Sequence, residues 1–251
     1  MRKTLFGCQI DALTMEQSLD KIESFVDSGM VHQHVVVNVN KVIKASRNPA
    51  LREIINNCDL VNCDGMPVCW ASRLLGRPLP ERVAGIDLFT NLVAKAARKK
   101  WRVFFLGARE EVVTRVVDTM KAKHPDLEVA GYRNGYWSEE EETQVVESIR
   151  TTKPDLLFVA ISSPKKEEFL GRYLQHMQIP FSMGVGGSFD VIAGLTKRAP
   201  VWMQKSGLEW FYRFAQEPRR LFGRYFVEGT LFLKLLALEL WRTKVTRKYG
   251  A

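Results

Sequence analysis

The stretch WRVFFLGAREEVVTRVVDTMKAK (Trp101–Lys123) decides the fold class of this chain. Its first seven residues are almost all apolar, which predicts a buried strand, and the valines that follow recur at helical spacing. A strand buried on both faces and followed directly by an amphipathic helix is the building unit of a parallel sheet. The stretch therefore predicts an α/β fold.

The same unit recurs on both sides of this stretch. The apolar runs and the helical patterns that follow them are HVVVNV before NKVIKASRN, DLVNC before GMPVCWASRLLG, LEVAGY before SEEEETQVVESIR, DLLFVAI before SPKKEEFLGRYLQH, and PFSMGVG before GSFDVIAG. Six units predict a Rossmann-like, mostly parallel sheet with helices on both faces. At the N-terminus we expect one short strand, then a helix that begins with a capping box of Thr14 and Gln17.

The charge of the chain changes near Lys197. Residues 197–251, here called the tail, carry 12 lysines and arginines against 4 glutamates, whereas residues 1–196, here called the body, carry 25 basic against 24 acidic residues. We therefore expect an α/β core in 1–196 and a basic helical appendage in 197–251. A basic segment on a neutral body indicates that the tail meets an anionic surface.

The tail also contains the apolar segment YFVEGTLFLKLLALELW (Tyr225–Trp241). Three charged residues interrupt it, so it is a poor transmembrane span. On a helical wheel the charged side chains from Arg220 to Arg242 fall within an arc of roughly 140°. This pattern predicts an amphipathic helix in a membrane interface, with its cations near lipid phosphates. The alternative is a helix packed on the protein's own core or in a subunit interface.

Several classes of protein are disfavoured by what the sequence lacks. The four cysteines form no C-x-x-C pair and have no histidine at metal-ligand spacing, which argues against zinc and against a disulfide framework. Neither a dinucleotide-binding nor a P-loop motif is present, so nicotinamide and ATP sites are disfavoured. No D-x-D pair offers ligands for a metal-bridged nucleotide-sugar. We expect no metal, no cofactor, reduced thiols and, without signal-peptide features, a cytoplasmic protein.

Ligands of parallel sheets bind beyond the carboxyl ends of the strands, so polar residues there are site candidates. Asp64 follows the strand DLVNC and is our candidate for a general base. The alternative is that Asp64 caps the helix that begins at Met66. Asp190 competes for the role of base, but its place in a helical turn suits capping or a nucleotide contact.

Two further strand ends carry features suited to an anion. The glycines of GVGGSFD (Gly184–Asp190) would let backbone amides approach a pyrophosphate, although a tight turn explains them equally. In SSPKKEE (Ser162–Glu168), Ser163 is expected to cap a helix with Pro164 at its first position. Lys165 and Lys166 oppose the dipole of that helix. They indicate either an anionic ligand or a solvated face.

The motifs taken together resemble a known family. They are NVNKV (Asn38–Val42), NCDGMPV (Asn62–Val68), RVAGIDLF (Arg82–Phe89), FFLGA (Phe104–Ala108), NGYW (Asn134–Trp137), SSPKKE, GVGGSFDVIAGLTKRAP and GLEWFYRFAQEPRRLFGRY. In this order they are similar to the WecG/TagA/CpsF glycosyltransferases, glycosyltransferase family 26. The resemblance implies an inverting, metal-independent enzyme that moves a sugar from a UDP donor to a polyprenyl-diphosphate-linked saccharide in bacterial teichoic-acid or polysaccharide synthesis. It implies N-acetylmannosamine as the sugar, with UDP-N-acetylmannosaminuronic acid or UDP-glucose as alternative donors, and a place on the inner face of the cell membrane.

The resemblance also implies roles for individual residues. The catalytic set is Asp64, Asn40 and Arg82; the donor set is Asn38, Gly107, Tyr136, Ser162, Pro164, Lys166, Glu167, Gly186, Gly187 and Asp190; and the set for the acceptor diphosphate or membrane is Arg213, Arg219, Arg220 and Arg224. Two residues depart from the family pattern, because Asn38 stands where a threonine is usual and Lys166 where a glutamine is usual. The extra charge of Lys166 would suit a uronate carboxylate or another phosphate contact.

The alternative from a different class of function is a nucleic-acid-binding module. The sequence pI of about 9.4 and the aromatic residues among the basic residues of the tail are features of nucleic-acid-binding modules. Such a module would present a more polar face than this tail. We therefore expect a UDP-sugar, a lipid-linked acceptor and an anionic membrane surface as partners, and no nucleic acid. The oligomeric state stays open, a homo-oligomer included.

Overall fold

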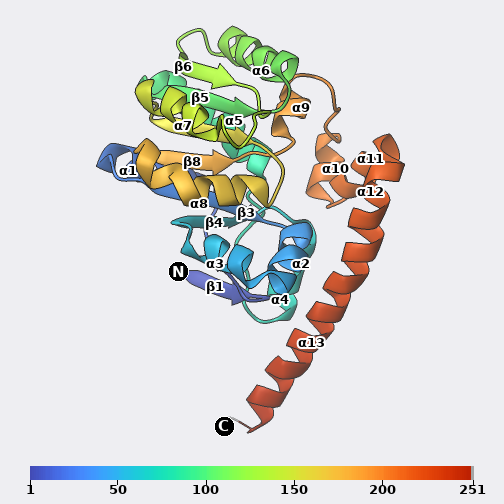
Figure 1. Ribbon diagram of the computed structural model, residues 1–251. Helices are drawn as coiled ribbons and strands as arrows, with labels where there is room; N and C mark the ends of the chain where they lie inside the picture. The colour runs from blue at the N-terminus through green and yellow to red at the C-terminus, as the bar shows by residue number, and fades with distance from the viewer. Residues whose placement is uncertain (250–251) are drawn as a thin grey trace.

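The protein forms a parallel sheet of six strands covered by helices (Figure 1). The structure is a computed structural model that describes residues 1–249, without the side chains of Arg220, Arg224 and 244–249. In sheet order the strands are β4 (Leu60–Cys63), β3 (His32–Val37), β8 (Phe181–Gly184), β7 (Leu156–Ala160), β5 (Arg102–Gly107) and β6 (Glu128–Arg133). All five pairings are parallel, so the predicted fold class is confirmed.

The central strands are buried on both faces, as their apolar runs predict. Phe105 of β5 and Phe158 of β7 point into one core, which they share with α1 (Met15–Ser28), α5 (Gly85–Lys99) and α6 (Glu110–Lys123). Their neighbours Phe104 and Leu157 point into a second core on the opposite face, with α7 (Glu142–Thr151) and α8 (Lys165–Met177). The side-chain period of two along each strand therefore builds two separate cores.

A third core covers the β3–β4 edge and contains α2 (Val39–Arg47), α3 (Pro49–Asn57) and α4 (Met66–Leu74). The helix that follows β8 is short, α9 (Ser188–Ile192). The capping box of Thr14 and Gln17 at the start of α1 is confirmed.

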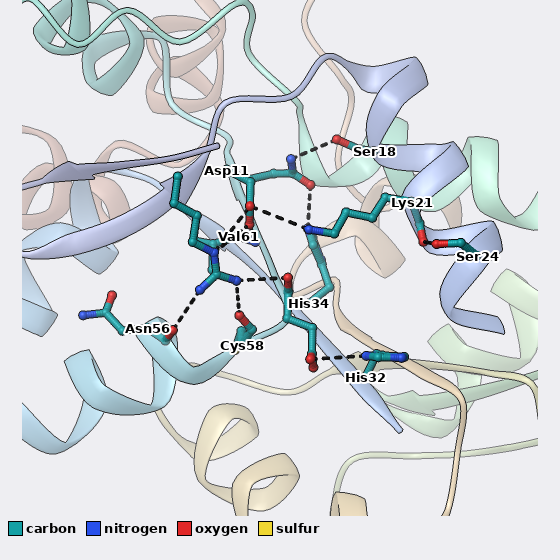
Figure 2. A network of polar contacts seen from close by, with 12 residues as sticks. Asp11, Ser18, Lys21, Ser24, His32, His34, Asn56, Cys58 and Val61 are labelled. Carbon is teal, nitrogen blue, oxygen red and sulfur yellow. Dashed lines mark hydrogen bonds and ion pairs between the residues drawn. The ribbon is translucent and has the colours of Figure 1, made fainter. Parts of the chain in front are cut away.

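The N-terminus forms a hairpin where we expected one short strand. β1 (Arg2–Leu5) and β2 (Cys8–Asp11) pair antiparallel around a turn at Phe6 and Gly7, both of which have positive φ. The carboxylate of Asp11 anchors this hairpin (Figure 2): it accepts a hydrogen bond of 2.9 Å from the backbone N–H of Val61 and lies 3.3 Å from the Arg2 guanidinium. The polar network fixes the hairpin against β4.

The tail is mostly helical in its described part. It comprises α10 (Val201–Lys205), α11 (Glu209–Gln216), α12 (Pro218–Phe222), a π-helical turn (Gly223–Val227) and α13 (Glu228–Tyr249). The long helix α13 runs along the body beside α2 (Figure 1). Phe232 is 4% exposed and its ring lies 5.0 Å from that of Phe6. One face of α13 thus packs on the protein's own core, as the alternative interpretation held.

The prediction that the charged side chains from Arg220 to Arg242 form one polar face of a single straight helix was wrong in two respects. The π-helical turn shifts the register between Arg220 and α13, so one straight wheel does not apply. Glu228 and Glu239 also bind the body, through Asn40 and Arg77 respectively, instead of lining a free polar face. The opposite side of α13 exposes Leu233, Leu238 and Trp241 to solvent. Among the described residues, no helix has the length and apolar content to cross a membrane.

Candidate functional site

Asp64 lies at the carboxyl end of β4 and is turned toward the start of another helix. Its backbone N–H donates to the carbonyl of Val37 at 2.9 Å, which fixes it between β4 and β3. The residue that caps α4 is Gly65, with no side-chain hydrogen bond, so the alternative that Asp64 caps this helix is wrong. Instead, its carboxylate accepts a hydrogen bond from the backbone N–H of Gly85, the first residue of α5.

The carboxyl of Asp64 is poised to hold or release a proton near neutral pH. The pKa of this carboxyl is raised from 3.8 to about 6. Burial is the main cause and the nearby Glu209 adds to it, whereas Arg82, the Gly85 amide and Arg213 oppose the rise. A carboxyl with a pKa in this range can act as a general base at neutral pH.

Residues of the tail reach this end of the sheet. Glu209 of α11 accepts a hydrogen bond of 3.0 Å from Arg82. Arg198 forms two hydrogen bonds with the carboxylate of Asp87 in the first turn of α5, at 2.5 and 2.7 Å. Nη2 of Arg213 lies 3.8 Å from the position that a Cβ would take at Gly187. The structure therefore brings Asp64, Arg82, Arg213 and the glycine loop after β8 into one neighbourhood.

Lys166 lies buried across the glycine loop. A Cβ added at Gly184 would come within 2.8 Å of Lys166 Cε, and one added at Gly186 would lie 3.6 Å from its Nζ. Gly186 itself has a φ of +51°, which favours glycine. The interpretation of Lys166 as part of a solvated face is wrong, because this residue is only 9% exposed. The carboxylate of Asp190 also turns back toward the loop, 3.8 Å from the Cβ position of Gly187.

A buried ion pair lies beneath this cation. Lys41 of α2 donates to Glu167 of α8 at 2.6 Å, and Lys166 Nζ is 3.8 Å from the same carboxylate oxygen. Burial alone would raise the pKa of Glu167, but Lys41 and Lys166 outweigh it and the pKa is lowered. One carboxylate thus faces two buried ammonium groups.

The segment before α8 differs from its prediction. The capping residue of α8 is Pro164, and no side chain caps the helix, so the assignment of this role to Ser163 was wrong. The Ser163 hydroxyl is buried without a hydrogen-bond partner among the described residues, and its carbonyl accepts from Lys44 at 3.0 Å. Ser162 is exposed, and Lys165 lies over the ring of Trp137 at 5.7 Å.

The two asparagines after β3 have structural partners of their own. Asn38 caps α2 by accepting from the backbone N–H of Lys41 at 3.1 Å. The side-chain amide group of Asn40 donates hydrogen bonds to both carboxylate oxygens of Glu228, at 2.6 and 2.7 Å. A residue of the tail therefore holds the Asn40 side chain.

Gly107 and Tyr136 lie along the same edge but away from Asp64. β5 is four places from β4, which corresponds to about 19 Å at the usual spacing between strands. Gly107 has a φ of +125°, and a Cβ there would lie 2.6 Å from the backbone of Ala160, so glycine is required. Tyr136 is exposed beside Gly135, which packs on Gly107.

The other arginines of the tail that were predicted to meet the acceptor or the membrane are Arg219, Arg220 and Arg224. Arg219 is exposed. The side chains of Arg220 and Arg224 lie outside the described residues, so their predicted role stays a prediction. The site residues predicted from the sequence did not include Lys41, Arg198, Glu209 and Glu228. The only signal for the two glutamates is their occurrence as rare acidic residues in a basic segment.

Comparisons with known proteins identify the family. The sequence profile described as "Glycosyl transferase WecG/TagA/CpsF family" matches residues 3–246. The chain belongs to this glycosyltransferase family. It is 39% identical over 186 residues to an N-acetylglucosaminyldiphosphoundecaprenol N-acetyl-beta-D-mannosaminyltransferase of Bacillus spizizenii. The aligned region covers 74% of this chain and 72% of the relative.

Two other relatives bear the same name. The protein of Bacillus subtilis is 36% identical over 73% of this chain and 71% of its own length. That of Staphylococcus aureus is 34% identical over 86% of this chain and 85% of its own length. The resemblance stated from the motifs is therefore confirmed for this glycosyltransferase.

Proposed function

We propose that this glycosyltransferase moves N-acetylmannosamine from a UDP donor to the N-acetylglucosamine of a polyprenyl-diphosphate-linked acceptor, with inversion and without a metal ion. The observation that carries the proposal is the partly buried carboxyl of Asp64, whose pKa is raised to about 6, beside Arg82 and Arg213 at the carboxyl edge of the sheet. The names of the relatives support the sugar and the acceptor.

In this mechanism Asp64 removes the proton from the acceptor hydroxyl as the hydroxyl oxygen attacks the anomeric carbon. The new glycosidic bond forms while the bond from the anomeric carbon to the phosphate oxygen of UDP breaks on the opposite face, which inverts the configuration. A positioned base typically contributes about 10² to 10⁴-fold to such a step. The raised pKa supports this role, since the carboxyl is ionised at neutral pH yet more basic than an exposed aspartate.

The negative charge that develops on UDP needs donors that are already in place. Lys166 lies against the glycine loop and Arg213 approaches Gly187, so two cations flank the backbone amides of Gly186 and Gly187. Preorganised donors of this kind are worth about 3 kcal/mol each. In our proposal they take the place of a metal ion. In this proposal Gly107 and Tyr136, farther along the edge, bind the nucleoside end of the donor. Asn38, Ser162 and Pro164 line the part of the edge between them and Asp64.

A panel of donors tests the reaction. The enzyme is incubated with a short-chain polyprenyl-diphosphate-N-acetylglucosamine and, separately, with UDP-N-acetylmannosamine, UDP-N-acetylmannosaminuronic acid and UDP-glucose, each in EDTA and in Mg²⁺. We expect a product of one added N-acetylmannosamine in both media, read by mass. Product from the uronic acid donor alone would assign Lys166 to its carboxylate. Activity that vanishes in EDTA and returns with Mg²⁺ would overturn the metal-free mechanism.

We also propose that the tail holds the enzyme on the anionic inner face of the cell membrane. The exposed side of α13 presents Leu233, Leu238 and Trp241 around Lys234. Apolar side chains with interspersed cations are typical of helices that lie in a membrane interface. The opposite side of the helix packs on the body, so α13 would lie between the body and the membrane.

Substitution of the three exposed residues tests this placement better than deletion of the tail, which would uncover the core around Phe232. The variant Leu233→Ser/Leu238→Ser/Trp241→Ser is expected to bind phosphatidylglycerol vesicles at least about tenfold more weakly, because burial of a large apolar side chain contributes about 1.5–3 kcal/mol. Vesicle flotation measures the binding. Met30→Ser, at an exposed apolar residue of the body, serves as control. Equal flotation of the triple variant and the unmodified enzyme would refute the proposal.

A further inference from the structure

The long side chain of Arg82 depends on the tail for its position. Arg82 lies in the irregular segment between α4 and α5, where the backbone makes no regular structure. In the described part of the chain, its guanidinium donates to Glu209 at 3.0 Å, and both side chains are mostly buried, at 15% and 19% exposure. A long side chain without such a partner would sample several rotamers. Glu209 therefore limits the rotamers that Arg82 can adopt.

Glu209 also lies within a small network of charges. Its second oxygen is 4.0 Å from Nε of Arg198, which in turn binds Asp87 of α5. One carboxylate from the first turn of α11 thus faces an arginine from each of two loops. The arrangement joins the tail to α5, the helix whose first amide binds Asp64.

We propose that Glu209 is a positioning residue of this glycosyltransferase, which holds Arg82 beside Asp64 and keeps a second negative charge next to that carboxyl. The proposal rests on the proposed role of Asp64 as the base. It adds to that role a function for Glu209, an acidic residue in a segment that is mostly basic.

The groups that face Asp64 determine how its titration should respond. They are Arg82 from the loop before α5, Glu209 and Arg213 from α11, Arg198 from the loop before α10, and Cys63 and Cys69 from β4 and α4. Of these, Glu209 adds to the effect of burial, whereas Arg82 and Arg213 oppose it. Removal of the charge of Glu209 should therefore lower the pKa of Asp64.

Two substitutions separate charge from position. Glu209→Gln keeps an oxygen that can accept from Arg82 but removes the charge, so the acid limb of the kcat/KM profile should move from about pH 6 to lower pH by about 0.5–1 unit with kcat nearly unchanged. Glu209→Ala also removes the hydrogen bond, so kcat should fall by roughly 10 to 100-fold, as expected for a misplaced arginine.

A matched control is present in the same tail. Glu239 pairs with Arg77 at 3.1 Å, a second contact between a glutamate of the tail and an arginine of the body, but it lies on α13 and binds the β1–β2 turn. Glu239→Gln should leave both the acid limb and kcat unchanged. If the pH profiles of kcat/KM for Glu209→Gln, Glu239→Gln and the unmodified enzyme superimpose, Glu209 only fixes the tail to the body. That result would overturn the proposal.

A measurement without substrate distinguishes failure of this inference from failure of the proposed function. The titration of Asp64 is followed by carbon-13 NMR of labelled aspartate, with Asp64→Asn used to assign its resonance. A lower pKa in Glu209→Gln supports the inference even if no donor of the panel is used. An unchanged pKa contradicts it even if the transferase activity is found.

Discussion

Asp64→Asn is expected to lower kcat by about 10² to 10⁴-fold while UDP binding is retained. An asparagine fills the same space and can still accept from the Gly85 amide, but it cannot remove a proton. The measurement pairs a product assay with calorimetric titration of UDP. Because no side chain changes size, the loss should lie in turnover and leave the binding of UDP intact.

The same substitution should stabilise the fold at neutral pH. The pKa of Asp64 is raised from 3.8 to about 6, so the folded state binds the proton more tightly than the unfolded state. Ionisation above pH 6 therefore disfavours folding, and this penalty disappears as the pH falls toward 4. We expect Asp64→Asn to raise the free energy of unfolding by about 1–3 kcal/mol at pH 8 and to change it little at pH 4.

Asp190→Asn is the control for this prediction, because Asp190 is the rival base on the same edge of the sheet. It should retain much of the activity. Near-normal turnover of Asp64→Asn together with loss in Asp190→Asn would transfer the role to Asp190. An inactive and destabilised Asp64→Asn would instead indicate that the carboxylate supports the structure.

Lys41→Met is expected to destabilise the protein by about 3–5 kcal/mol, the usual cost of leaving a buried charge without its partner. Lys41 and Glu167 are 5% and 2% exposed, and Oε2 of Glu167 has no hydrogen-bond partner among the described residues. Lys166, at 3.8 Å, is too distant to replace a contact of 2.6 Å. Denaturant unfolding at pH 7 measures the loss.

The double substitution Lys41→Met/Glu167→Met should recover most of this stability, since two well-packed apolar residues replace a buried ion pair at little cost. Arg150→Met, which breaks an exposed pair with Glu147 of 2.8 Å, should cost less than about 1 kcal/mol. If the double variant is no more stable than Lys41→Met, the loss comes from packing, and the charge of Glu167 is not its cause.

The strands and most helices of the body follow from the sequence because burial on both faces gives a strong local pattern. β5 and α6 begin and end within a few residues of the predicted stretch. The hairpin of β1 and β2 escaped prediction, since its strands have four residues each and its anchor, the carboxylate of Asp11, binds a strand 50 residues away. Local patterns do not contain such contacts.

The candidate site shows the same division between local and distant information. The topology places Asp64, the glycine loop and Lys166 at the carboxyl edge of the sheet. This could be predicted, because each of them directly follows a predicted strand in the sequence. The partners of Arg82 and Asn40 come from the tail, 127 and 188 residues away. The prediction for the tail failed because a helical wheel treats a helix as straight and isolated. In the structure a π-helical turn, and two glutamates that bind Asn40 and Arg77 of the body, decide which side of α13 faces the body.

The contact between α13 and the N-terminal hairpin has a consequence for how the enzyme is made. Phe232 covers Phe6, so a turn that is synthesised before the six-stranded sheet is covered by a helix that is synthesised after it. Glu209, Arg213 and Glu228, which reach the Asp64 neighbourhood and Asn40, also follow β8, the last strand of the sheet in the sequence. A nascent chain that has folded its whole sheet still lacks these groups. The core around Phe232 and the Asp64 neighbourhood are therefore completed only after the helices that follow β8 have been synthesised.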